Sequence, residues 1–244
     1  MHNVLIVMRR EWLAYFHTPI APIYLIIFLV LSTALTFYVG GFYEREIADL
    51  EPFFQFHPWI YLFLVPAIGM RLWSEEYRSG SAELLLTLPL STWEVVLGKY
   101  LAALGLIGLG LALSFPIWIT VNVLGDPDNG VIVGAYLGSW LMAGGFLAIS
   151  AAASATTSNQ VVAFIASATL CFALLMAGMP LVLDPMGQVL PQSMVDVISQ
   201  TSLLIHYSAM ARGILDFKSG VYFVGLITLM LISNWALIEF RKAP

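Results

Sequence analysis

The feature that most constrains the fold of this sequence is the spacing of its charged residues. No charged side chain occurs between Asp128 and Asp184. Four other uncharged runs are each close to or above the roughly 20 apolar residues that a helix needs to cross the hydrocarbon core of a bilayer. They occupy residues 18–43, 52–70, 100–125 and 219–238. This distribution predicts a chain that crosses a membrane several times.

The run between Asp128 and Asp184 is too long for one helix and suits two. Its polar break, SATTSNQ at residues 154–160, predicts a tight turn between them. Hydrophobic residues make up 60% of the 244 residues and charged residues only 10%, against about 25% charged in a typical soluble domain. We therefore expect an all-α polytopic membrane protein with one transmembrane domain, residues 1–244. The six spans are predicted at about residues 20–41, 53–73, 94–123, 132–154, 160–183 and 219–240.

The basic residues indicate how the chain is oriented. With a cytoplasmic N-terminus, the outer segments hold only Arg45, Arg212 and Lys218. The positive-inside rule therefore favours both termini in the cytoplasm. The net charge of -5 and the lack of a basic cluster give no indication of nucleic-acid binding. The basic residues of the cytoplasmic segments are Arg9, Arg10, Arg71, Arg78, Lys99, Arg241 and Lys242.

Patterns that would indicate catalysis or self-powered transport are missing from the sequence. It has no GxxxxGK[ST] motif for nucleotide phosphates. The predicted spans carry essentially no ionisable residue in mid-membrane, which an ion-coupled carrier would be expected to have. The four histidines lack metal-binding spacing, so neither a metal site nor catalytic residues are expected. We predict that the chain is not an enzyme and that energy for any transport comes from another chain.

Residues 3–16 are predicted to form an amphipathic helix at the membrane interface. Arg9 and Arg10 lie away from its apolar face, as they would in an interfacial helix. Ile6 and Leu13 interrupt this pattern. The apolar face comprises Val4, Leu5, Met8, Trp12 and Tyr15.

Residues 192–216, between the last two predicted spans, are long enough for one or two short helices. Leu204, Tyr207, Ala211 and Ile214 recur at intervals of three and four, which is the spacing of one helix face. Such helices could dip into the outer leaflet, and a plain surface loop is the alternative.

The most charged part of the chain, residues 70–99, surrounds a short apolar run. Ser79-Gly80-Ser81 predicts a break, after which Ser81 could cap a helix that starts at Ala82. Pro89 would end this helix after about two turns, which is marginal for an isolated helix in water. Its leucines have no evident core within the chain, so they require either the membrane surface or a partner protein. The alternative is a solvated loop whose charges only fix the topology.

The same segment resembles the ABC-2 type transporter permeases, particularly the branch associated with gliding motility and nitrous-oxide-reductase maturation. The pattern of that family runs from an Arg at the end of the second helix through Glu-Glu, Gly-Thr/Ser-x-Glu and Leu-Leu-x-x-Pro to Gly-Lys. The six predicted spans and the two helical segments described above agree with this resemblance along essentially the whole chain. The matching residues are Arg71, Glu75-Glu76, Gly80-Ser81-Ala82-Glu83, Leu85-Leu86-Thr87-Leu88-Pro89 and Gly98-Lys99.

The resemblance implies an ATP-driven exporter in which residues 81–89 form a coupling helix that docks on a separate ATP-binding subunit. Residues 3–16, with Arg9, Arg10 and Trp12, would be the connecting helix, and residues 192–216, with Leu204, Tyr207, Ala211 and Ile214, the outer gate helices. The docking residues would be Arg78, Ser79, Gly80, Ser81, Glu83, Leu84, Leu85, Leu86 and Thr87, with Leu88 also seating the helix.

The resemblance also implies the partners. Two ATP-binding subunits, which bind the ATP and Mg²⁺, would assemble with this chain and a second permease copy or homologue in the bacterial inner membrane, with room for an accessory protein. This chain would hold no cofactor. The alternative hypothesis is a membrane scaffold that recruits a cytoplasmic ATPase through the same helix without transporting anything.

Overall fold

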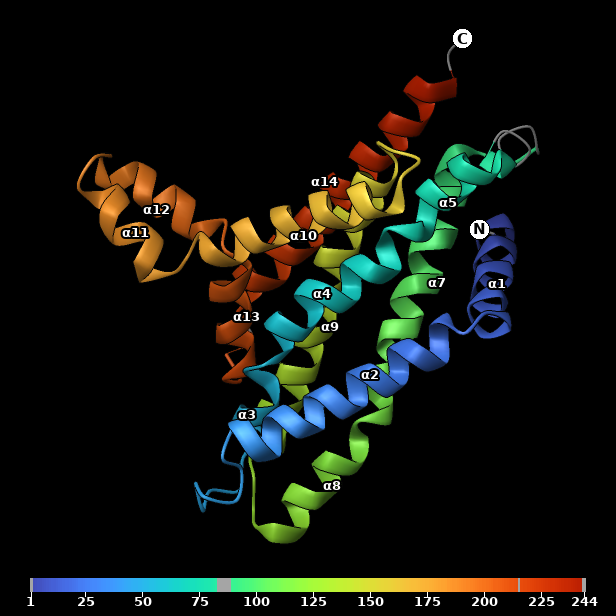
Figure 1. Ribbon diagram of the computed structural model, residues 1–244. Coiled ribbons are helices and arrows are strands. Elements are labelled where there is room, and N and C mark those ends of the chain that lie inside the picture. Colours follow the sequence, from blue (N-terminus) through green and yellow to red (C-terminus); the bar gives the residue numbers. More distant parts are fainter. Residues whose placement is uncertain (1, 83–88, 215, 243–244) are drawn as a thin grey trace.

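The computed structural model describes residues 2–82, 89–214 and 216–242, and within these residues the chain is helical with no strand (Figure 1). A short π-helix, η1, continues the second helix. The elements are α1 (His2–His17), α2 (Ile20–Ala34), η1 (Leu35–Val39), α3 (Glu51–Phe54), α4 (His57–Gly69), α5 (Arg71–Ser79), α7 (Thr92–Leu113), α8 (Phe115–Leu124), α9 (Asn129–Ser154), α10 (Gln160–Met176), α11 (Pro180–Gly187), α12 (Gln192–Gln200), α13 (Leu203–Ala211) and α14 (Phe217–Lys242).

Five stretches of helix are long and apolar enough to cross a membrane, and α10 with α11 makes a sixth if this bent pair is one span. The prediction of an all-α polytopic membrane protein is therefore confirmed. The axes of α10 and α11 differ by 69°. The bend lies at Gly178, where an added Cβ would come within 2.5 Å of the Ser202 hydroxyl oxygen. Pro180 begins α11 and has no N–H to continue the helical bonding of α10.

The second span is composite and extends further than residues 53–73. Helix α4 passes into α5 at Met70, and α5 ends only at Gly80, whose backbone is left-handed with φ +74°. Glycine adopts this conformation without strain, which makes it the usual helix terminator. Helices α7 and α8 also follow one another, with Ser114 between them and Pro116 at the start of α8. The helix breaks thus occur near proline or glycine, as chain stereochemistry favours.

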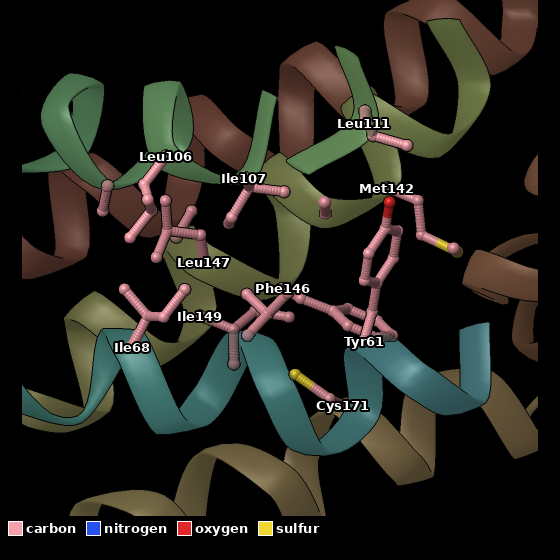
Figure 2. Close-up of a cluster of buried hydrophobic side chains, with 14 of the residues drawn as sticks. Tyr61, Ile68, Leu106, Ile107, Leu111, Met142, Phe146, Leu147, Ile149 and Cys171 are labelled. Atoms are coloured by element: carbon pink, nitrogen blue, oxygen red, sulfur yellow. The ribbon is translucent and has the colours of Figure 1, made fainter. Parts of the chain in front are cut away.

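Helix α9 lies at the centre of the bundle and packs against α4, α7, α10 and α14. Figure 2 shows Phe146 and Leu147 of α9 between the apolar side chains of α4 and α7, with Cys171 of α10 nearby. Small residues allow the backbones to approach: an added Cβ at Gly69 would lie 2.3 Å from that of Ser150. Close packing of this kind holds helices together in lipid, where the hydrophobic effect between helices is weak.

The two ends of the bundle differ. Both chain termini and the end of α5 lie at one end, which we call the terminal end, and α3 and α8 lie at the other, which we call the far end (Figure 1). Helices α11 and α12 project from the bundle beyond the bend after α10 (Figure 1). Residues 79–82, the described part of the segment that the sequence predicts to dock, lie at the terminal end.

Candidate functional site: an ion-pair cluster beside the docking segment

Helix α1 lies along the first turns of α7, with the two helices in register. The Asn3 amide donates to both carboxylate oxygens of Glu94 at 3.2 Å. One turn later, an added Cβ at Gly98 would lie 2.7 Å from the Val7 Cβ atom. Two further turns along, an added Cβ at Gly105 would lie 2.6 Å from the Trp12 ring. Gly98 and Gly105, seven residues apart, therefore form the surface of α7 against which α1 packs, which we call the glycine seat.

This packing corrects the predicted face of the N-terminal helix. Leu5 is 56% exposed, whereas Val7, which was not assigned to the apolar face, is 3% exposed. The buried face is selected by the glycine seat on α7 rather than by the apolar pattern alone. Trp12 and Tyr15 do face the bundle, whereas Arg9 and Arg10 are exposed.

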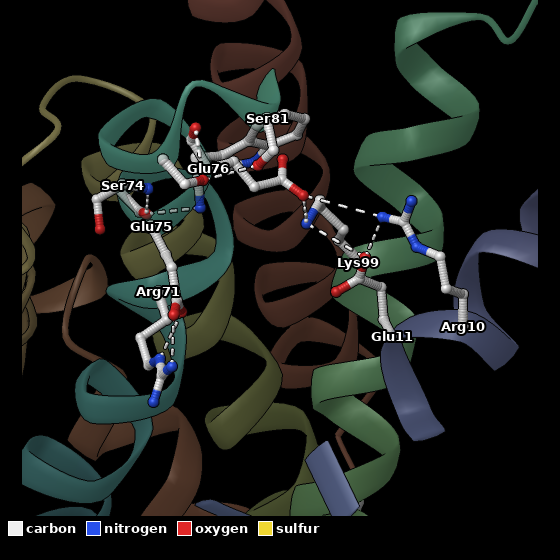
Figure 3. Close-up of polar contacts among 11 residues, drawn as sticks. Arg10, Glu11, Arg71, Ser74, Glu75, Glu76, Ser81 and Lys99 are labelled. Atoms are coloured by element: carbon white, nitrogen blue, oxygen red, sulfur yellow. Dashed lines mark hydrogen bonds and ion pairs between the residues drawn. The ribbon is translucent and has the colours of Figure 1, made fainter. Parts of the chain in front are cut away.

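Lys99 of α7 is the centre of an ion-pair cluster that joins three helices (Figure 3). Its ammonium Nζ lies 2.7 Å from Glu76 Oε1 of α5 and 3.4 Å from Glu11 Oε1 of α1. Arg10 of α1 pairs with the neighbouring Glu11, and its Nη2 atom lies 3.8 Å from Glu76 Oε1. Lys99 is only 3% exposed, and burial of a charge is tolerated only when it is well paired.

The charges around Glu11 favour the ionised form of its carboxyl group. Burial alone would raise the pKa of the Glu11 carboxyl, but Lys99 and Arg10 outweigh burial and lower it below the ordinary value of 4.5. The Lys99 ammonium also lies 5.4 Å from the centre of the Trp73 ring, within the distance of a cation–π interaction. The cluster therefore holds α1, α5 and α7 together through charge, and a shift of α5 would move Glu76 relative to Lys99 on α7 and Glu11 on α1.

The predicted docking segment, residues 79–87, begins where α5 ends. Arg71 forms a bidentate pair with Glu75, with both N···O distances 2.7 Å. The Ser79 and Ser81 hydroxyl oxygens are 2.8 Å apart on either side of Gly80. Ser81 and Ala82 are already helical, so Ser81 lies inside the new helical turn and not just before it.

The predicted docking residues are divided by the limits of the described structure. Arg78, Ser79, Gly80 and Ser81 lie together at the terminal end, and the first three are exposed. The predicted contacts Glu83, Leu84, Leu85, Leu86 and Thr87, together with Leu88, lie outside the described residues. Glu76, three residues before Ser79, connects this segment to the ion-pair cluster.

A cavity of about 240 Å³ lies beside the cluster. Its walls come from the three helices that the cluster joins, α1, α5 and α7, with Thr18 and Ile20 at its edge. Arg71, Glu75 and Tyr15 line it together with Lys99 and its two acidic partners. The ion pairs thus border open space, which leaves room for the three helices to shift relative to one another.

At the far end, α13 carries three of the four predicted gate residues. Tyr207 is 2% exposed, and its hydroxyl donates to the Phe54 carbonyl of α3 at 2.7 Å. Ile214 lies beyond the helix, which ends because Gly213 has φ +79° and the Ile214 amide bonds back to the Ala209 carbonyl at 3.1 Å. The expected single face of Leu204, Tyr207, Ala211 and Ile214 therefore stops at Ala211.

Two cavities flank the contact between α13 and α3. One of about 380 Å³ and one of about 320 Å³ share Glu51, Phe54, Ala211 and Arg212 in their walls. Below Phe54, the His57 ring nitrogen Nδ1 and the Tyr61 hydroxyl each lie 2.8 Å from the Ser139 hydroxyl oxygen. The Tyr207 contact therefore lies between two openings and above a buried polar group that joins α4 to α9.

Sequence reasoning missed the ion-pair cluster as a functional unit. In the sequence Lys99 indicates topology, and Glu76 and Lys99 both belong to the family motif, but no contact between them is predicted and Glu11 is not singled out. Helices α2 to α5 lie between Glu11 and Lys99 along the chain, so their pairing is a tertiary effect. The available signal was the motif itself, since a Glu-Glu pair and a Gly-Lys pair bracket the same short helix.

The fold and this arrangement define the class: a polytopic helical membrane protein without a nucleotide-binding motif, whose charged groups gather beside a segment at the terminal end. The chain belongs to the ABC-2 family of transporter proteins, because the model of that family, described as ABC-2 family transporter protein, matches residues 28–238. This confirms the resemblance at the level of the family, while the branch stays a prediction. A comparison with curated proteins found no match. Family membership makes the chain a membrane permease subunit of an ABC transporter, which implies an ATP-binding partner.

Proposed function

We propose that this permease subunit forms the membrane part of an ATP-driven exporter. The movement of the ATP-binding subunit would reach it through residues 79–87. The observation that supports this most is the cluster of Lys99, Glu76 and Glu11, because it joins the helix that leads into this segment to two further helices. A force applied to the segment would act on α5 first. The buried ion pairs would then transmit it to α1 and α7, since separating the charges in a poorly hydrated site is costly.

The partners follow from this role. Two ATP-binding subunits bind the ATP and Mg²⁺, this chain binds neither, and a second permease copy or homologue completes the transporter. The transporter lies in a bacterial inner membrane, and the terminal end of the bundle faces the cytoplasm. The excess of basic residues in the segments at that end supports this orientation. Closure of the ATP-binding subunits pushes on residues 79–87, and the bundle rearranges until the contact between α13 and α3 opens at the far end.

Two substitutions in the docking segment test the proposal. Glu83→Arg reverses a charge, and Leu85→Asp places a charge where an apolar contact with the partner is expected. Either variant should lose at least about tenfold in affinity for the ATP-binding subunit, which corresponds to about 1.4 kcal/mol. The measurement is co-purification of that subunit with tagged permease from membranes.

Asp184→Arg is the matched control, because Asp184 is exposed on α11, which lies well away from the docking segment (Figure 1). It should leave the amount of bound ATP-binding subunit unchanged. Normal recovery of that subunit with both Glu83→Arg and Leu85→Asp would show that docking occurs elsewhere.

A further inference from the structure

A groove on the lipid-facing side of α7, α8 and α9 has a volume of about 430 Å³ and is almost wholly apolar. Gly108 and Leu111 lie in it on α7, Phe115 and Trp118 on α8, and Leu137 and Trp140 on α9. It is separate from the ion-pair cluster and from the cavities beside α13. None of the predicted docking, connecting or gate residues contributes to it.

The aromatic walls of the groove present ring faces, because their polar atoms are bonded elsewhere. The Trp118 indole N–H donates to the Asn129 side-chain oxygen at 2.7 Å. The Tyr136 hydroxyl lies 3.0 Å from the Ser114 hydroxyl. The Trp118 and Tyr136 rings are stacked, with centres 5.6 Å apart. A groove of this kind offers nothing to water and suits hydrocarbon.

The polarity of the groove changes along its length. Gly108 lies near the middle of the span formed by α7 and α8, and Trp118 lies toward its far end. Beyond Trp118, the side chains of Asn122 and Asn129 are hydrogen-bonded to each other. One end of the groove therefore lies at mid-span and the other meets a polar group near the end of the span.

Length and width select the occupant. The ten residues from Gly108 to Trp118, which pass through the break at Ser114, rise at most about 15 Å, which is half of a hydrocarbon core of about 30 Å and hence the depth of one leaflet. Over that length, a volume of about 430 Å³ corresponds to a mean cross-section of about 29 Å², which is far too small for a helix about 10 Å or more across. A single flexible hydrocarbon chain fits both constraints.

We propose that this groove binds one acyl chain of a phospholipid in the leaflet at the far end, with the headgroup near Asn122 and Asn129. The inference concerns a lipid site on the permease and is independent of how the ATP-binding subunit docks. It also locates a lipid on helix α7, the same helix that carries Lys99 at its terminal end.

The test uses the full-length permease in phosphatidylcholine vesicles that contain an analogue with a diazirine on one acyl chain. After illumination, the labelled peptides are identified by mass spectrometry. Residues 108–118 and 133–140 should be labelled about tenfold more than the equally lipid-exposed residues of α14, as expected for a site that favours the chain by about 1.4 kcal/mol. Even labelling of all lipid-facing helices would overturn the proposal.

Filling the groove gives the second arm of the test. Ala112 lines the groove and is exposed, so Ala112→Phe should reduce labelling of residues 133–140 to the level of α14. Val224→Phe, at an exposed position of α14, is the control and should leave that labelling unchanged. A thermal unfolding measurement shows whether each variant is folded. If Ala112→Phe is misfolded, Val133→Phe, on the opposite wall of the groove, is used in its place. Unchanged labelling in a variant that folds normally and has the groove filled would contradict the site.

A second permease copy is the alternative occupant of the groove. Two results together would assign the groove to it and overturn the lipid proposal: protection of residues 108–118 from the label, and a disulfide between two copies of a Leu137→Cys variant.

Discussion

At the scale of single residues, Lys99 is the position where burial and charge conflict most. It is surrounded by two carboxylates and an aromatic ring instead of water. Lys99→Met keeps the length of the side chain but leaves Glu76 and Glu11 with one cationic neighbour, Arg10, which is half exposed. We expect the free energy of unfolding in detergent to fall by about 3–5 kcal/mol, the usual cost of leaving a buried charge without its partner.

Arg71 provides the matched control for Lys99. It also pairs with a carboxylate, that of Glu75, but these two side chains are 30% and 47% exposed. Arg71→Met should therefore cost less than about 1 kcal/mol. The double variant Lys99→Met with Glu76→Gln should be more stable than Lys99→Met alone, because one uncompensated charge is removed. Equal losses in the two single variants would show that Lys99 is not buried as described.

Glu11 gives the cluster a dependence on pH. Its pKa is lowered in the folded protein from an ordinary value of 4.5, so its contribution to stability is complete above that pH and is lost as the pH falls below it. The melting temperature of the unaltered protein should fall more steeply between about pH 5 and pH 3 than that of Glu11→Gln. Parallel curves for the two proteins would mean that Glu11 does not titrate against Lys99.

The residues of the ion-pair cluster also show how much of the candidate site can be predicted from the sequence. The short apolar segment and its charged flanks are local patterns, but the helix predicted there stays a prediction because residues 83–88 lie outside the described residues. The cluster was not predicted, because it requires α1 to lie on α7. Gly98 and Gly105 set this contact, and although Gly98 belongs to the family motif, nothing in the sequence indicates that α1 packs against it. A lysine beside a span was interpreted as a topology signal, which is its commonest role.

At the scale of elements, the hydrogen bond from Tyr207 holds α13 to α3. Tyr207→Phe leaves the buried carbonyl of Phe54 without this donor and should cost about 1–3 kcal/mol. Loosening this contact should also expose Ala211→Cys, placed in the same variant, to faster labelling by a water-soluble maleimide. Tyr222→Phe removes a hydrogen bond to the Thr201 carbonyl at a more exposed place and should change neither stability nor labelling as much. Equal labelling in both variants would contradict the claim that the Tyr207 hydrogen bond holds α13 to α3.

The elements also show where sequence periodicity is sufficient. Long uncharged runs located the spans because hydrocarbon excludes charge along their whole length. The predicted span at residues 160–183 did not divide α10 from α11, and the end of α13 was not predicted. The break between α10 and α11 and the end of α13 each depend on a glycine with a specific tertiary or backbone role: Gly178 against Ser202, and Gly213 with its positive φ. The continuation of α5 to Ser79 was also not predicted, since its charged residues resemble a loop until their partners on α1 and α7 are known.

At the scale of the whole molecule, the proposed function requires that the two ends of the bundle move together. Residues 79–82, where the predicted docking segment begins, lie at the terminal end with the ion-pair cluster, and the contact of α13 with α3 lies at the far end (Figure 1). Helix α9 packs against α4, α5, α7, α13 and α14 and so connects the two regions. A scaffold that only recruits an ATPase would have no need of this connection.

The most direct measurement is ATP hydrolysis by the complete transporter in lipid vesicles when the far end is locked. Glu51 and Ala211 line the same two cavities, so Glu51→Cys with Ala211→Cys can be joined by a short bismaleimide, with each single cysteine as a control. A coupled exporter predicts that the cross-link lowers hydrolysis by the bound ATP-binding subunit by about tenfold or more, equivalent to at least about 1.4 kcal/mol in the barrier. An unchanged rate with the far end locked would contradict coupling and favour the scaffold.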